Sequence, residues 1–397
     1  MTSFIAWIDH DAEARARSTR LIALFDQKES RDELGIGAIR DSFADILFPG
    51  TSTIQTRLRY MLIVPWVYKF LEDQIIPSGK FEKKARDLEL SLVTPLLNSH
   101  DTSGVFGKNA GEQLKRLPSS VYWSGLIEWG ILRSNLSQND YHRNLDAVYQ
   151  KRKLHSLGKP DFEELLDDFS TWHTGLPGTP DDFPESLIIN LTAAEAQFIK
   201  ECIAKNADKT LLAHLMVNEM KSDQKFIWDH ESYNTFSEDN KKVLYHARLF
   251  SFAMHGAALL YNLMLAELQG TEELVEDHEE SLKEWNLSSV TSELRNWNLS
   301  DMWGLFHKRK HNITIFTRDF VTAWVDFLKN KLSGQNLKTS KIARNLIISR
   351  ERQKDNKSRF DNRQLLDRWR GYSGLNPLSY RWPVVRQFLN DLIQTIG

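Results

Sequence analysis

The sequence predicts a mainly α-helical protein with two helical domains. Three observations support this fold class. Apolar residues recur at helical spacing along much of the 397-residue chain. Capping patterns stand where the predicted helices begin, for example Thr192 with Glu195. No proline occurs between Glu185 and Arg370, where the only glycines are Gly256, Gly270, Gly304 and Gly334. Because both residue types break helices, their scarcity favours long ones.

The composition is that of a folded protein with a sizeable core. Hydrophobic residues make up 41% of the chain and charged residues 26%, which excludes wholesale disorder. The single cysteine, Cys202, excludes a disulfide framework and a cysteine zinc site. The N-terminus lacks a basic start followed by an apolar run, so we expect a cytoplasmic protein without a signal peptide. The twelve tryptophans are interpreted as packing anchors, with stacking platforms for bases as the functional alternative.

A linker is predicted at residues 175–184, where GLPGTPDDFP contains three prolines and two glycines. It would separate an N-terminal helical domain, residues 1–174, from a C-terminal helical domain, residues 185–397. The overall charge of −2 hides a contrast. Residues 201–300 hold 17 acidic and 9 basic side chains, whereas residues 338–397 hold 13 basic and 5 acidic ones. The basic end is the part suited to nucleic acid.

The clearest helical signals of the N-terminal domain lie between residues 31 and 71. A turn with Gly35 and Gly37 leads into an amphipathic helix that ends before Gly50. Gly35 and Gly37 are interpreted as positions where another part of the chain packs closely against the start of that helix.

A second helix is predicted to begin at Thr51, where Ser52 and Gln55 have capping-box spacing. Its apolar residues between Tyr60 and Leu71 point in every direction around the axis. A helix with that pattern is buried, so we expect the central core helix of the domain here.

The start of this second helix is a candidate anion-binding site. A helix N-terminus offers free N–H groups, and the hydroxyls of Thr51, Ser52 and Thr53 lie beside them. Arg57 follows one turn later, so the site would suit a phosphate-bearing ligand. The alternative is that Arg57 has a structural role.

No sequence pattern identifies catalysis, a metal or a cofactor. The chain lacks a P-loop, a nucleophile elbow and an HExxH pattern, so a non-enzymatic function is favoured, enzymatic activity stays open, and no cofactor is expected. Asp41 and Asp45 have the i, i+4 spacing of metal ligands, but ion pairs with nearby arginines are favoured. The histidines of residues 307–311 have three cations between them, and the acids of residues 9–11 are too close together. We therefore expect no metal.

Two further apolar segments have alternative interpretations. Residues 117–133 form a short helix ended by Gly130, a unit that also occurs in winged helix-turn-helix domains, so DNA contact and simple packing both stay open. Residues 249–266 contain no charge and are long enough for a membrane span. Their polar residues favour a buried helix instead, and Gly256 lies on a small-residue face that would let another helix approach. No membrane contact is expected.

The last sixty residues hold the candidate nucleic-acid-binding side chains. On one continuous helix, a positive stripe within about 40° would include Lys341, Arg352, Arg359 and Arg363. With Arg344 and Arg381, they are the residues expected to contact the phosphates of DNA or RNA. The oligomeric state is not encoded in any pattern.

Four blocks carry a resemblance to a known family. They are DELGIGAIRDSFADILFPGTSTIQTRLRYMLIVPWVY (32–68), LPSSVYW (117–123), GAALLYNLMLAE (256–267) and LSYRW (378–382). In them the chain resembles an uncharacterised bacterial family known only as a domain of unknown function. The resemblance implies a setting, gene islands with helicases and other phage-defence components, and neither a reaction nor catalytic residues.

These observations predict a component of a bacterial anti-phage defence system. It would be a nucleic-acid-binding or adaptor subunit that works with a helicase or nuclease partner. The alternative is a protein–protein interaction module or toxin-like effector that touches no nucleic acid. An enzyme built on Asp41 and Asp45 is a third possibility, without a supporting motif.

Overall fold

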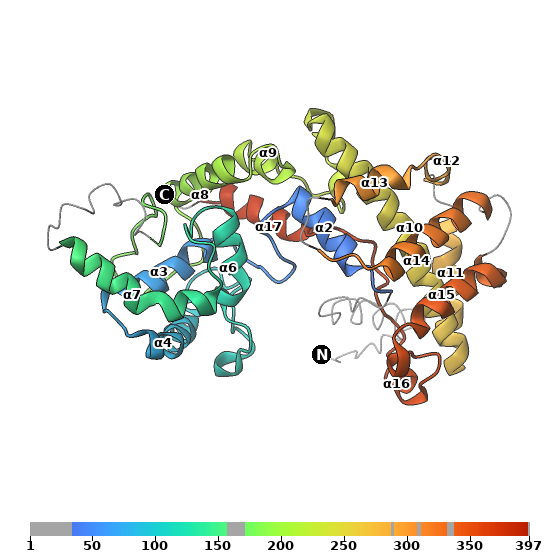
Figure 1. Ribbon diagram of the computed structural model, residues 1–397, viewed down its shortest axis with the longest axis horizontal. Helices are drawn as coiled ribbons and strands as arrows, with labels where there is room; N and C mark the ends of the chain where they lie inside the picture. Colours follow the sequence, from blue (N-terminus) through green and yellow to red (C-terminus); the bar gives the residue numbers. More distant parts are fainter. Residues whose placement is uncertain (1–33, 157–170, 287–289, 308–310, 332–336, 396–397) are drawn as a thin grey trace, which may run out of the picture. The chain divides into compact units, whose positions relative to one another are not determined.

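The structure is a computed structural model that describes residues 34–156, 171–286, 290–307, 311–331 and 337–395. These residues are mainly helical, which confirms the predicted fold class (Figure 1). They contain no β-strand, and one isolated antiparallel bridge joins Leu132 and Trp172. The acidic pattern at residues 9–11 and the glycine at position 334 lie outside the described residues.

The chain divides into two compact units. Unit 1 comprises Met1–Ser42 and Tyr245–Leu378, and unit 2 comprises Phe43–Leu244 and Ser379–Gly397. The predicted linker at residues 175–184 lies within unit 2, and the domain boundary expected there stays a prediction.

Unit 2 is built around α3 (Tyr60–Asp73). Helices α4 (Ser78–Ser91) and α6 (Pro118–Glu128) pack against α3, and α7 (Gln138–Ser156) packs against α4. The other helices that lie wholly in the described part of this unit are α5 (Val93–Leu97), α8 (Ala193–Asn206), α9 (Leu211–Val217) and α17 (Trp382–Ile393). Helix α9 packs against both α8 and α17.

Helix α3 confirms the predicted core helix, because every residue from Tyr60 to Tyr68 is buried. Aromatic rings surround Tyr68, with centroids 5.2 to 5.9 Å away, and they belong to Phe81, Trp123, Tyr141 and Trp172. The tryptophans act mainly as the expected packing anchors. Among the described ones, only Trp228 and Trp303 are half-buried, and the rest are buried.

Unit 1 is built around the second part of α10 (Glu238–Gln269). Its other described helices, besides the start of α2 (Gly37–Leu47), are α11 (Glu272–Asn286), α12 (Thr291–Arg295), α13 (Leu299–Leu305), α14 (Ile315–Lys331), α15 (Lys341–Arg352) and α16 (Arg363–Asp367). Helix α14 packs against α12 and α15.

Two tryptophans attach neighbouring helices to α10. Trp285 of α11 donates its indole N–H to Phe252 O (3.0 Å), and Trp324 of α14 donates to Ala253 O (2.8 Å). A Cβ on Gly256 would lie 2.7 Å from Cε2 of Trp285, so only glycine allows the ring to lie there. The predicted small-residue face is therefore confirmed.

Helix α10 is the only helix in the described ranges that is long and apolar enough to cross a membrane, with a mean hydropathy of 1.5. Within the protein, 83% of that apolar stretch is buried, as expected for a core helix. One such helix is weak evidence for a membrane span, because buried core helices have the same composition.

The turn at Gly35 shows the predicted close packing before α2. Gly35 has a φ of +64°, and the Arg350 guanidinium occupies the place of a Cβ. Arg350 Nε donates to Leu34 O (2.7 Å), and Nη2 donates to Gly35 O (3.0 Å) and to Thr317 Oγ1 (2.9 Å). The arginine thus satisfies carbonyls that precede the helix.

Gly125 of α6 provides a test of the packing in unit 2. A Cβ at this position would overlap Gly50 O and lie 2.6 Å from Met61 Cε. We expect Gly125→Ala to lower the free energy of unfolding by about 1–3 kcal/mol, because backbone must shift to admit the methyl group. Urea unfolding measures this difference. Gly79→Ala in α4 is the matched control, since a Cβ there meets nothing within 4 Å. An equal loss in both variants would contradict the packing argument.

Candidate functional site

The segment after α2 is a turn, so the prediction of a helix from Thr51 is wrong. Helix α3 begins at Tyr60. Local hydrogen bonds hold the turn: Thr51 Oγ1 donates to Phe48 O (2.6 Å), and Ser52 N donates to Gln55 Oε1 (2.9 Å). Side chains that bond nearby backbone in this way compete with helix formation.

Distant side chains take the backbone N–H groups that a helix would have used. Thr56 N and Arg57 N donate to the Tyr122 hydroxyl at 2.9 and 3.1 Å. Leu58 N donates to Asp391 Oδ2 at 2.7 Å. These partners lie far away in the sequence, which is why local spacing could not reveal them.

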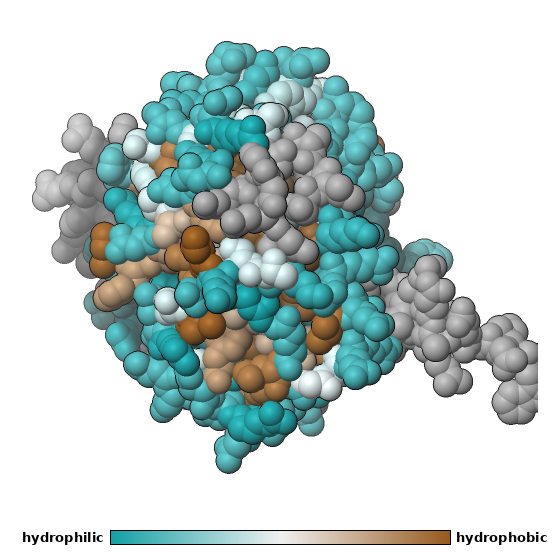
Figure 2. Space-filling model, turned by 90° about the vertical axis from the view of Figure 1, so that its right-hand side faces the viewer, coloured by the Kyte–Doolittle hydropathy of each residue, from teal (hydrophilic) through white to brown (hydrophobic). Residues whose placement is uncertain are grey.

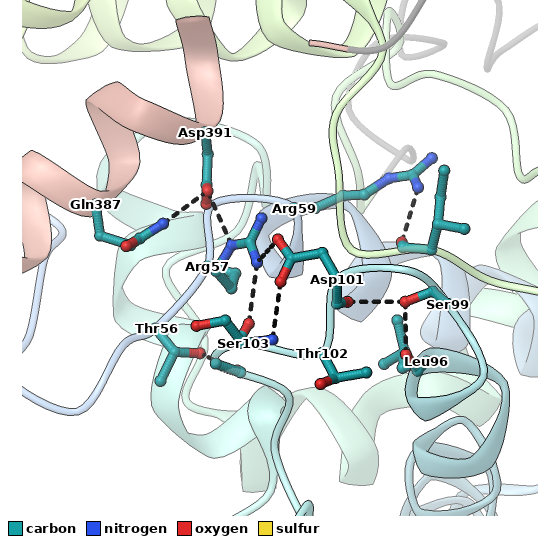
Figure 3. Close-up of polar contacts among 12 residues, drawn as sticks. Thr56, Arg57, Arg59, Leu96, Ser99, Asp101, Thr102, Ser103, Gln387 and Asp391 are labelled. Carbon is teal, nitrogen blue, oxygen red and sulfur yellow. Dashed lines mark hydrogen bonds and ion pairs between the residues drawn. The ribbon is translucent and has the colours of Figure 1, made fainter. Parts of the chain in front are cut away.

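Arg57 lies at the centre of a buried polar cluster (Figure 3). Its Nε donates to Asp391 Oδ1 at 2.8 Å, and its Nη1 donates to Asp101 Oδ2 at 2.6 Å and to Ser103 O at 2.9 Å. The side chain is only 4% exposed. A guanidinium that donates along two edges to two carboxylates is held in one geometry.

The two carboxylates of this cluster differ in their surroundings. Burial raises the pKa of Asp391, although Arg57, the Leu58 N–H and Gln387 oppose the rise. Asp101 is more exposed, and hydrogen bonds from Ser103 N–H and from Arg57 outweigh its desolvation and lower its pKa. Among the described residues, Arg57 is therefore the only cation that contacts Asp391, and the cluster depends on it.

The four residues of the predicted anion site do not form one accessible surface. Thr53 is exposed, but Thr51 and Arg57 are buried. The Ser52 hydroxyl is buried and has no hydrogen-bond partner among the described residues. Arg57 already binds two anions of its own chain, so a phosphate would have to displace a carboxylate. This arrangement favours the structural interpretation of Arg57.

Both acidic residues of α2 form ion pairs with arginines. Asp41 pairs with Arg40 (3.0 Å), and Asp45 pairs with Arg381 (2.6 Å). Arg381 also donates to Thr51 O (2.6 Å), so this candidate nucleic-acid-binding side chain already has hydrogen-bond partners within unit 2. Within the described ranges, no group of three or more potential ligands is placed to hold a metal ion.

The predicted basic stripe is not on one helix. Helix α15 ends at Arg352, and Asp355 adopts a φ of 52°. A 3₁₀ turn follows, and α16 begins only at Arg363. A non-glycine residue in the left-handed region cannot continue a right-handed helix, so the side chains of the stripe are distributed over three short elements.

Most of the candidate basic residues also have partners within unit 1. Arg344 pairs with Glu267, Arg352 with Asp361 (3.0 Å) and Arg363 with Asp367 (3.0 Å). Arg359 donates to the Tyr261 hydroxyl at 2.9 Å. Lys341 is exposed at the start of α15. The positive charge available to a partner is therefore smaller than the sequence indicates.

Other cations of this segment remain accessible and were not among the candidates. Lys357, Arg368 and Arg370 are exposed. None of them forms an ion pair with a described residue, and the same holds for Lys341. Trp369 is buried between two of these arginines, which leaves both flanking side chains at the surface. In the sequence, the alternation of charged and apolar residues at 368–370 was the pattern that could have indicated these exposed arginines.

Replacing Arg57 tests the buried cluster. We expect Arg57→Met to lower the free energy of unfolding by about 3–5 kcal/mol, because it leaves the Asp391 carboxylate buried without its cation. Chemical denaturation monitored by tryptophan fluorescence measures the loss. Arg352→Met is the control, since Arg352 and Asp361 form an exposed pair and should contribute little. If the two variants were equally stable, the structural interpretation of Arg57 would fail.

Comparison with known proteins adds a family and no activity. Searches of curated proteins and of solved structures found no match. One family model matches residues 2–396, which is nearly the whole chain. The protein belongs to that family, described as a family of unknown function (DUF6361).

Proposed function

We propose that this protein is a nucleic-acid-binding subunit of a bacterial anti-phage defence system that works with a helicase or nuclease. The defence setting is supported by the sequence resemblance alone. The nucleic-acid contact is supported by one structural observation: four exposed cations of unit 1 have no ion-pair partner among the described residues. They are Lys341, Lys357, Arg368 and Arg370.

The surrounding segment has the charge that phosphate contact requires. Residues 338–378 contain 11 basic and 4 acidic side chains, a net charge of +7. Long side chains that are exposed and unpaired can reach phosphates without first breaking an internal ion pair. Contact with phosphates does not depend on the base sequence of the nucleic acid. We therefore propose binding to the DNA or RNA backbone and not base-specific recognition.

The proposal makes a prediction about salt. A variant with glutamine at Lys341, Lys357, Arg368 and Arg370 should bind labelled DNA and RNA more weakly than the wild type. Four phosphate contacts predict a fall in affinity of roughly 100-fold from about 50 to 200 mM salt in the wild type, and a much flatter dependence in the variant. Fluorescence anisotropy at several salt concentrations measures both.

The matched control removes the same charge from unit 2. Lys69, Lys80, Lys83 and Lys84 are exposed, and their fourfold glutamine variant should keep the wild-type affinity and salt dependence. The proposal fails if the wild type binds neither nucleic acid at low salt. It also fails if both fourfold variants lose affinity equally, because only net charge would then matter.

A second function is supported by a different observation. Ile315 and Phe316, at the start of α14, are 61% and 62% exposed. The face drawn in Figure 2 is mainly hydrophilic, with hydrophobic residues gathered in separate patches. An exposed apolar pair of this kind is a candidate point of contact with a protein partner. Stable co-purification with the product of a neighbouring gene, lost in an Ile315→Ser/Phe316→Ser variant, would support this adaptor function.

A further inference from the structure

Partly exposed ion pairs hold several cations of the basic segment, residues 338–378 of unit 1. Among the described residues, four pairs each join one of these cations to a carboxylate that is also at the surface. They are Lys338 with Glu279, Arg344 with Glu267, Arg352 with Asp361 and Arg363 with Asp367. Every side chain in these pairs is at least 27% exposed. A phosphate can therefore approach each of these cations without any unfolding of the chain.

The paired cations lie on the same elements as the unpaired ones. Lys341 and Arg344 are three residues apart in α15, so they lie on one face of that helix. Arg352 is the last residue of α15, and the exposed Lys357 follows in the next turn of the chain. A nucleic-acid strand that contacts the unpaired cations therefore passes beside paired ones.

The other basic residues of the segment have internal contacts and are not available. Arg350 donates to two backbone carbonyls, Lys354 pairs with the fully buried Glu351, and Arg359 donates to the Tyr261 hydroxyl. The 11 basic residues of the segment thus comprise four unpaired cations, four in exposed pairs and three with internal contacts. Only the second group can change between a carboxylate and a phosphate.

We propose that the carboxylates of these pairs inhibit nucleic-acid binding by holding four further phosphate-binding cations. These competing carboxylates are Glu267, Glu279, Asp361 and Asp367. A phosphate meets the unpaired cations directly, but at the paired ones it would have to displace a charged, hydrogen-bonded carboxylate. The inference rests on the proposed nucleic-acid contact and concerns the regulation of that same surface.

The strength of exposed ion pairs is appropriate for such an inhibition. An exposed pair contributes little to the stability of a fold, so it can be opened or removed while the protein stays folded. Opening one pair nevertheless lowers the affinity for a phosphate by about two- to fivefold, and the four factors multiply. We therefore expect the pairs to stay closed when the wild type binds, and its salt dependence to reflect the unpaired cations alone.

A fourfold variant tests this inhibition: Glu267→Gln, Glu279→Gln, Asp361→Asn and Asp367→Asn together. Its affinity for a labelled DNA duplex should rise by about tenfold or more at low salt, because eight cations can then contact phosphates instead of four. The slope of log affinity against log salt should steepen from about −3.6 in the wild type to about −7 in the variant. Fluorescence anisotropy measures both quantities, and circular dichroism shows that the variant is folded.

The matched control removes the same charge from the same unit without releasing a cation. Glu272, Glu276, Glu280 and Glu284 of α11 are exposed, and none of them forms an ion pair with a described residue. Their fourfold glutamine variant should keep the wild-type slope and change the affinity by about threefold at most, because salt screens charges that are not in contact. An equal rise in both variants would overturn the inference, since net charge alone would then explain it.

A smaller variant covers the case in which the fourfold one does not fold. Asp361→Asn/Asp367→Asn releases Arg352 and Arg363 and should steepen the slope by about 1.8, half of the full effect. Wild-type binding that neither variant strengthens would overturn the inhibition alone. If wild type and variants all failed to bind DNA, the proposed function would fall together with it.

Discussion

The buried contact of Arg57 with Asp391 is the interaction on which unit 2 depends. It joins residues 334 positions apart and so brings the final helix of the chain against the segment that precedes α3. The Asp391 carboxylate accepts both the guanidinium and the Leu58 N–H. Neither charge is stable in the interior alone, because desolvation is repaid only when both partners are present. The pair therefore determines where the last helix packs.

Other buried polar groups of unit 2 follow the same rule. Glu72 accepts hydrogen bonds from Tyr141, from the Trp172 indole (2.8 Å) and from Arg152 (2.7 Å). Arg59 pairs with Glu195 at 2.6 Å. Glu195 also takes part in the capping box at the start of α8. Glu89 is one of several described residues of unit 2 with a buried polar atom that has no hydrogen-bond partner among the described residues.

Unit 1 uses charge differently. Acidic residues of α10 and α11 neutralise part of the basic segment that follows, through pairs of Glu267 with Arg344 and of Glu279 with Lys338. The acidic and the basic regions of the sequence thus partly neutralise each other through ion pairs inside unit 1. Only the cations without such a partner remain available, and they carry the proposed contact with phosphate. Net charge counted along the sequence overstates the positive surface for this reason.

Local sequence patterns were sufficient to predict the helical class, the burial of α3 and α10, the capping box at Thr192 and Glu195, and the close packing at Gly35 and Gly256. These features follow from the spacing of apolar residues, from caps and from glycines, all of which act over a few neighbouring residues. The folded structure was needed to show that the helix after Thr51 begins at Tyr60, that the basic stripe is interrupted, and that Arg57 binds Asp391. The interruption of the stripe lies in the left-handed backbone of Asp355. The other features depend on groups distant in sequence, which meet only where the folded chain brings them together.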